Sequence, residues 1–264
     1  MPLTEIQKEL GRILALNRSE DSYLAGGAAI LSDPQTKRYS QDLDYFHDSP
    51  ERVVSAYEAD RKVLEENGFK IKQDINQLGY VRVVVSRGDL ATKIEWAHDS
   101  SWRFMPVIKS KDFGYQLHPI DSATNKVLAL AGRDEPRDLL DTMYVHKEIL
   151  GLGPLVWAAT GKDPGFSPLS LMELLKRRGK IRPEDLSRLH LSEIPNIQQL
   201  KMEWIEAIKC AEVFIRSRPI EDVGCLYYST LRQKFVDPGE KDIGEISLHF
   251  GKPGGVLPNI LEET

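Results

Sequence analysis

Features that mark several protein classes are scarce or missing in this sequence of 264 residues. It has two cysteines, Cys210 and Cys225, and neither belongs to a CxxC or Cys/His spacing, so we expect two buried thiols rather than a zinc site or a disulfide framework. No stretch approaches the roughly 18 consecutive apolar residues that a membrane-spanning helix requires. The N-terminus, MPLTEIQKELGRILAL, lacks the basic start and apolar core of a secretion signal. We therefore expect a cytoplasmic protein that makes no membrane contact.

An excess of positive charge is also absent. The net charge is −5, which argues against a protein that coats nucleic acid non-specifically, although an acidic chain can still carry a local basic patch. What the sequence has is 41% apolar and 28% charged residues, typical of a globular protein, and enough length for one large domain or two smaller ones. From Gly151 onward glycine and proline become frequent, and helical patterns follow. We predict an α/β domain over residues 1–150 and a mainly helical domain over residues 151–264.

The most informative stretch is YLAGGAAILSDPQTKRYSQDLDYF, from Tyr23 to Phe46. Its Gly26-Gly27 pair suits a turn in which backbone N–H groups come close to a phosphate, ahead of a short helix. Farther along, polar residues occupy every second position: Arg38, Ser40, Asp42 and Asp44. Because alternate side chains of a strand share a face, we predict a strand over residues 39–46 with these four side chains on one side. Two neighbouring carboxylates repel each other, and a divalent cation is the simplest way to hold both ionised.

This pattern resembles the signature of the nucleotidyltransferase superfamily, in which a Gly-Gly or Gly-Ser turn and a helix precede a strand that carries Asp-x-Asp. The fuller pattern, G-G-A-A with R-x-S-x-D-x-D about ten residues later, resembles the AbiEii/AbiGii toxin family of nucleotidyltransferases. The matching residues are Gly26, Gly27, Ala28, Ala29, Arg38, Ser40, Asp42 and Asp44. The resemblance covers roughly residues 20–147. It implies an α/β fold with a mixed sheet flanked by helices, a nucleoside triphosphate substrate, and the toxin half of a toxin–antitoxin or phage-defence system with a cognate antitoxin.

Alternating patterns predict further strands over residues 69–73, 80–87 and 91–97, with a hairpin turn at Gly88-Asp89. In the last of these strands Lys93 and Glu95 face one way and the apolar residues the other. A third acid occupies a neighbouring strand in nucleotidyltransferases, and the resemblance implies that Glu95 is this acid. Family members often carry Asp here, and a site for one metal would remain if Glu95 faced away.

A second motif follows in a region of predicted helices. In the AbiEii-like family a helical lysine is followed by a short linker and R-D-x-x-D, and the matching residues are Lys126, Arg133, Arg137, Asp138 and Asp141. The resemblance implies that Lys126 neutralises triphosphate charge. It implies for Asp138 a role in orienting Lys126 or in contacting the ribose or the acceptor. Ion pairs between two surface helices would explain the same spacing without a ligand.

Nucleotidyl transfer expels pyrophosphate from the α-phosphate of a nucleoside triphosphate, and its catalysis is chiefly metal clamping and alignment. We expect Asp42 and Asp44 to coordinate Mg²⁺, with Mn²⁺ as the alternative ion. Glu95 would complete a second metal site with one of these aspartates. A site that offers carboxylate oxygens and no His/Cys ligand set suits these ions.

The other polar residues of the long stretch are expected to bind phosphate. The backbone amides of Gly26 and Gly27, with the Ser40 hydroxyl, would hold the β- and γ-phosphates. Arg38 would contact phosphate as well, or it would pair with Asp42 and orient that carboxylate.

Three functions stay open at this point. The resemblance implies transfer of nucleotides to RNA, notably the 3′ end of tRNA; the alternatives are transfer to a protein hydroxyl or a small molecule such as an aminoglycoside, and a nucleotide-binding regulator without turnover. The presence of all three acids disfavours the regulator. The basic run from Lys176 to Arg182 would hold phosphates of RNA or of a nucleotide, or would simply end a helix, which we favour. His98 and His118 are expected to be structural.

Overall fold

A computed structural model of the chain describes residues 3–30, 38–133 and 135–259. The chain divides into two compact units. The first comprises Met1–Ser122 with the short segments His190–Ser192 and Pro253–Gly255, and the second comprises the rest of the chain. The division into domains over residues 1–150 and 151–264 stays a prediction.

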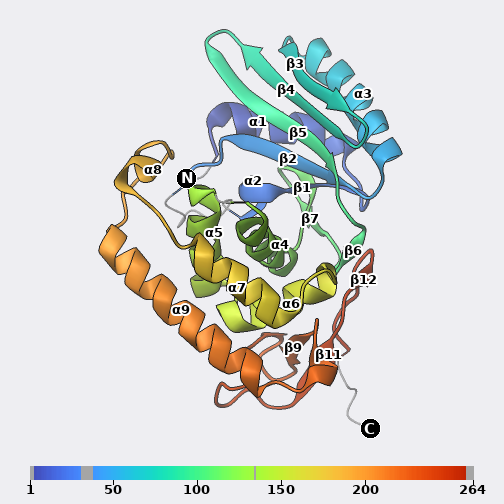
Figure 1. The fold of residues 1–264 in the computed structure, drawn as a ribbon. Helices are drawn as coiled ribbons and strands as arrows, with labels where there is room; N and C mark the ends of the chain where they lie inside the picture. The colour runs from blue at the N-terminus through green and yellow to red at the C-terminus, as the bar shows by residue number, and fades with distance from the viewer. Residues whose placement is uncertain (1–2, 31–37, 134, 260–264) are drawn as a thin grey trace. The chain divides into compact units, whose positions relative to one another are not determined.

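The first unit contains a mixed sheet (Figure 1). In the described residues this sheet has seven strands in the spatial order β3–β4–β5–β2–β1–β8–β7. Strand β2 runs parallel to β5 and antiparallel to β1, whereas β3, β4 and β5 pair in antiparallel fashion. A short strand, β6, lies outside the sheet. The bounds are β1 Ser22–Ala25, β2 Asp42–His47, β3 Lys70–Gln77, β4 Tyr80–Arg87, β5 Leu90–His98, β6 Trp102–Arg103, β7 Ile108–Ser110 and β8 Gly114–Gln116.

Two helices of this unit pack against the sheet, and a third connects β1 to β2. They are α1 Glu5–Leu14, which continues into a 3₁₀ turn at Ala15–Asn17, α3 Pro50–Glu66, and the short α2 Gly26–Ile30. Helix α1 begins at a capping box: the Thr4 hydroxyl accepts the N–H of Gln7, and the Gln7 side chain accepts the N–H of Thr4. Helix α3 begins at Ser49, whose hydroxyl accepts the N–H of Arg52.

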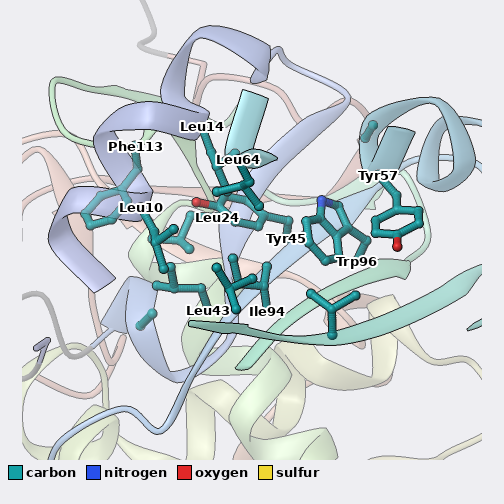
Figure 2. Close-up of a cluster of buried hydrophobic side chains, with 14 of the residues drawn as sticks. Leu10, Leu14, Leu24, Leu43, Tyr45, Tyr57, Leu64, Ile94, Trp96 and Phe113 are labelled. Atoms are coloured by element: carbon teal, nitrogen blue, oxygen red, sulfur yellow. The ribbon is translucent and has the colours of Figure 1, made fainter. Parts of the chain in front are cut away.

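A hydrophobic core fills the space between α1, α3 and the sheet (Figure 2). The labelled residues of this core are Leu10, Leu14, Leu24, Leu43, Tyr45, Tyr57, Leu64, Ile94, Trp96 and Phe113. Trp96 of β5 is completely buried, and its indole N–H donates to the Asp60 carboxylate of α3 at 2.7 Å. Asp60 also pairs with Arg18, and both charged side chains are fully buried. Because the core residues of β2 and β5 alternate with polar ones, their packing holds the polar side chains on the opposite face.

The second unit is mainly helical, and its part from residue 151 onward forms the helical C-terminal region that was predicted. Helix α4 begins four residues before the unit boundary and continues into it. After the last long helix, three short strands form an antiparallel sheet in the order β10–β9–β11. The bounds are α4 Pro119–Gly132, α5 Pro136–Glu148, α6 Leu152–Lys162, α7 Pro168–Arg178, α8 Pro183–Ser187, α9 Ile197–Ser217, a 3₁₀ turn Ile220–Asp222, β9 Leu226–Ser229, β10 Lys234–Phe235, β11 Ile246–His249 and β12 Lys252–Pro253.

The expectation of two buried thiols needs correction. Cys225 is buried as expected, but Cys210 is exposed on α9, and both thiols are free. Val213 of α9 is also exposed, because the apolar stripe of this helix turns through Ala211 and Phe214 instead. In the described part of the chain, no helix combines the length and apolar character needed to cross a membrane.

Candidate active site

Two adjacent strands bring three carboxylates together in the first unit. In the parallel pairing of β2 with β5, Asp44 lies opposite Glu95. Asp42 and Asp44 alternate along β2 with the buried Leu43 and Tyr45, so both acids emerge on the face away from the core. One carboxylate oxygen from each of Asp42, Asp44 and Glu95 lies within 4.8 Å of the others, and all three residues are half-buried. Three carboxylates at this separation form a donor set that suits a hard divalent cation such as Mg²⁺.

Gly26 lies directly beside this cluster. Its neighbour Ala25 pairs with Asp44 across β1 and β2, and the chain then turns into α2 through Gly26 with φ +62°. A Cβ atom at this position would lie 1.8 Å from Oδ2 of Asp44, so no residue with a side chain fits here. The structure thus places Gly26 and the second acid of the Asp-x-Asp motif together. Gly27 follows in α2 and is buried.

Glu95 has two partners of its own on β4. The Tyr80 hydroxyl donates to Oε2 at 2.8 Å, and the Arg82 guanidinium Nε donates to Oε1 at 2.8 Å. Burial, and then the hydrogen bond to Glu95, raise the pKa of Tyr80, so the phenol stays protonated and acts as a donor. Arg82 also lies 3.9 Å from Asp74. These contacts fix the direction of the Glu95 carboxylate and balance one of the three negative charges in the cluster.

The segment before β2 departs from the predicted strand. The strand begins at Asp42, so Arg38 and Ser40 precede it, and the prediction that they share a strand face with the two acids is wrong. Ser40 instead donates its hydroxyl to the backbone oxygen of Asp42 at 2.9 Å, and its own carbonyl accepts the side-chain amide of Gln7 at 3.2 Å. Such local bonds replace ladder hydrogen bonds and delay the start of the strand. Arg38 is buried and forms an isolated β-bridge with Leu191.

The second predicted motif forms a buried charge network in the second unit. Lys126 of α4 places its ammonium group 2.8 Å from Asp141 and 3.9 Å from Asp138, both on α5. The Arg133 guanidinium also donates two hydrogen bonds to the Asp138 carboxylate, at 2.6 and 3.1 Å. Lys126, Asp138 and Asp141 are each at most 7% exposed. The structure thus brings these four residues together in the ion pairs between helices that the spacing predicts, with Lys126 and both aspartates buried and Arg133 half exposed.

The basic run is partly occupied by contacts within the second unit. Lys176 pairs with Glu173 and Glu212, and Arg178 donates to a backbone carbonyl at the end of α4. Helix α7 ends at Gly179, where a Cβ atom would lie 2.2 Å from the indole nitrogen of Trp204. These contacts agree with the interpretation of the run as a helix end.

The histidines have local roles or are exposed. His118 accepts the N–H of Ile120 at 3.2 Å at the beginning of α4, and His98 is exposed at the end of β5. The sequence patterns did not point to His47, which is completely buried on β2. Burial, with the nearby positive charges of Arg18 and Arg52, lowers the pKa of His47 to about 3.

Comparisons with known proteins bear on the fold. No protein-family model matches the chain, and no curated protein matches its sequence. Among solved structures, MenT4, a nucleotidyltransferase toxin from Mycobacterium tuberculosis, is similar over 82% of this chain and 83% of its own, with a TM-score of 0.50 and 16% identity. JHP933 from Helicobacter pylori is similar over 81% of this chain and 95% of its own, with a TM-score of 0.46 and 17% identity. The likeness to MenT4 confirms the predicted architecture: the chain has a nucleotidyltransferase fold.

Proposed function

We propose that this protein is a metal-dependent nucleotidyltransferase that transfers a nucleoside monophosphate from a nucleoside triphosphate to RNA. The observation that carries this proposal is the meeting of Asp42, Asp44 and Glu95 on one sheet face, with Gly26 packed against them. Three carboxylates held within 4.8 Å of one another are costly to bring together unless a cation is bound there. The shared fold with a nucleotidyltransferase toxin supports the same reaction class.

In this reaction an oxygen of the acceptor hydroxyl bonds to the α-phosphorus. The bond from that phosphorus to the bridging oxygen breaks, pyrophosphate leaves, and the hydroxyl proton passes to solvent or to a nearby carboxylate. Asp42 and Asp44, with Glu95, would hold Mg²⁺, which supplies charge neutralisation on the phosphate oxygens and lowers the pKa of the acceptor hydroxyl. Tyr80 and Arg82 keep the Glu95 carboxylate oriented.

The phosphate contacts belong to the same proposal. The amides of Gly26 and Gly27 and the Ser40 hydroxyl would contact the β- and γ-phosphates, and Arg38 would add a positive charge. Lys126 would neutralise triphosphate charge. Asp138 and Asp141 would hold its ammonium group in position.

The proposed acceptor is the 3′ end of tRNA, and the proposed biological role is that of a toxin in a toxin–antitoxin or phage-defence system. MenT4 is itself described as a toxin. A toxin of this kind arrests growth when it is expressed alone in a bacterial host. Coexpression of a cognate antitoxin should restore growth.

Transfer of label tests the proposed activity. The protein is incubated with Mg²⁺, total cellular RNA and each of four α-³²P-labelled nucleoside triphosphates in turn. We expect label on a tRNA-sized band with one of the four nucleotides. Asp44→Asn should abolish this label, whereas Asp89→Asn, a matched change on the exposed hairpin turn, should retain it. Equal labelling by the Asp44 variant would contradict the site. Label on protein or on a small molecule would show that this molecule, and not RNA, is the acceptor. Nucleotide binding without any transfer would favour a regulator.

A further inference from the structure

The sheet face that carries the three acids continues across β5, β4 and β3. Asp42 lies opposite Lys93 of β5, Lys93 opposite Val84 of β4, and Val84 opposite Lys72 of β3. Directly paired residues of neighbouring strands project to the same face, so this row crosses four strands on the side away from the core. In the adjoining row Ser86 of β4 pairs with Lys70 of β3.

This extension of the face is positively charged. Lys70, Lys72 and Lys93 are all exposed, and none of them forms an ion pair with any residue that the structure describes; we call these three residues the lysine strip. Arg82 adds a fourth cation on the same face, paired with Glu95. Asp74 lies at the irregularity of β3, 3.9 Å from Arg82, and Asp42 lies directly opposite Lys93 at the edge of the acid cluster. The β3 end of the strip, with Lys70 and Lys72 beside the single acid Asp74, therefore keeps a net positive charge.

The spacing of the strip suits a long anion. Neighbouring strands lie about 4.8 Å apart, so the backbone of Lys93 is about 5 Å from that of Asp42, and the backbone of Lys72 is about 14 Å away. The positive charges therefore extend from the edge of the acid cluster outward, over a distance larger than one nucleotide. A nucleoside triphosphate bound at the acids does not need cations two strands away, whereas a polymer with a charge on every residue does.

We propose that the lysine strip binds the phosphodiester backbone of a single-stranded RNA end and directs its terminal hydroxyl to the acid cluster. This inference rests on the proposed nucleotidyl transfer to RNA. The same face carries small or β-branched residues between the lysines, namely Val84, Ser86 and Ala91, so no large side chain between the lysines keeps bases and backbone away. The strip also offsets the repulsion that the carboxylates exert on the RNA backbone.

A triple variant tests the strip. Lys70→Gln, Lys72→Gln and Lys93→Gln are combined. The matched control combines Lys62→Gln, Lys201→Gln and Lys241→Gln, three exposed lysines on α3, on α9 and between β10 and β11. Affinity for a fluorescent single-stranded RNA with a free 3′-hydroxyl is measured by anisotropy at several salt concentrations, and the KM for RNA is measured in the transfer assay. We expect the strip variant to bind RNA at least tenfold more weakly. Its slope of log affinity against log salt should become shallower by about 2, since each phosphate contact with single strands contributes about 0.7. Affinity for the nucleoside triphosphate should be unchanged.

The two proposals fail in different ways. If the wild-type protein labels RNA while the strip variant matches the control in affinity, salt slope and KM, the strip is not the acceptor surface and the transfer activity stands. If the wild-type protein labels only protein or a small molecule, the RNA acceptor is wrong, and equal RNA binding by strip variant and control then overturns the strip as well. A strip variant whose only loss is affinity for the nucleoside triphosphate would also overturn the inference.

Discussion

Gly26 leaves no space between its backbone and the carboxylate of Asp44. A Cβ atom on Gly26 would lie 1.8 Å from Oδ2 and 2.5 Å from Cγ of Asp44. The glycine also has φ +62°, which residues with a side chain rarely adopt. Two independent physical constraints, the backbone conformation and the close approach, thus act on one residue beside the proposed metal site.

The first prediction separates these two constraints. In Gly26→Ala the positive φ should lower the unfolding free energy by about 1–2 kcal/mol, and the new Cβ atom must also displace the Asp44 carboxylate. Gly68→Ala has the same conformational penalty at φ +77°, but nothing lies within 4 Å of its new Cβ atom. We expect similar losses of unfolding free energy from backbone strain in both, but a loss of transfer activity of about 100-fold only in Gly26→Ala, because small displacements at a reacting centre are costly. Equal activities of the two variants would show that the contact with Asp44 is unimportant.

A second prediction concerns the Arg82–Glu95 pair. Arg82→Met removes the cation that balances the carboxylate cluster, so repulsion among the three acids should lower the unfolding free energy by about 1 kcal/mol without metal. Added Mg²⁺ relieves this repulsion and should therefore raise the melting temperature more in the variant than in the wild type. Thermal unfolding with and without Mg²⁺ measures both effects. Arg61→Met, which breaks an exposed pair on α3, is the control and should leave the Mg²⁺ shift unchanged. An unaltered shift in Arg82→Met would contradict a metal site at these acids.

The acid cluster could be predicted from sequence because its determinants are local. Strict alternation along β2 places Asp42 and Asp44 on one face, and the two-residue turn at Gly88-Asp89 sets the register of the hairpin β4–β5. The same register pairs Arg82 with Glu95, so this partner of Glu95 could also be predicted from the sequence. The parallel neighbourhood of β2 and β5, by contrast, came from the family resemblance, since no local pattern specifies it.

The start of β2 could not be predicted for the opposite reason. The carbonyl of Ser40 is bonded by Gln7 of α1, and the backbone of Arg38 pairs with Leu191, far away in the sequence. Such long-range contacts override the alternation that predicts a strand from residue 39. The buried state of Lys126 escaped prediction in the same way, because its carboxylate partners shield it only once α4 and α5 have packed together.

A third prediction follows from the buried His47. Its pKa is about 3 in the folded protein, whereas an unfolded histidine titrates near 6.5. Between these values the unfolded chain binds more protons, so the contribution of His47 is fully present above pH 6.5 and is lost progressively as the pH falls. His47→Leu removes this titration. Urea unfolding should show that the unfolding free energy of the wild type, relative to this variant, falls by about 2 kcal/mol between pH 7 and pH 5. Parallel pH profiles for wild type and His47→Leu would contradict the prediction.

The last prediction asks whether Lys126 supports the fold, the reaction or both. Lys126→Met leaves Asp141 buried without its lysine partner, which should cost about 3–5 kcal/mol of unfolding free energy. Lys147→Met, which breaks a more exposed pair with Glu203, should cost at most about 1 kcal/mol. The double variant Lys126→Met/Asp141→Leu removes both charges of the 2.8 Å pair and leaves Asp138 paired with Arg133, so it should recover most of the lost stability.

Activity of the double variant then decides between the roles. If Lys126 neutralises triphosphate charge, the double variant should fold, as shown by cooperative unfolding, and yet bind the nucleoside triphosphate and transfer label at least tenfold less well. A purely structural lysine would give a double variant with wild-type transfer and nucleotide affinity. Because the fold is restored in the same protein in which the charge is missing, a loss of activity there cannot be attributed to unfolding.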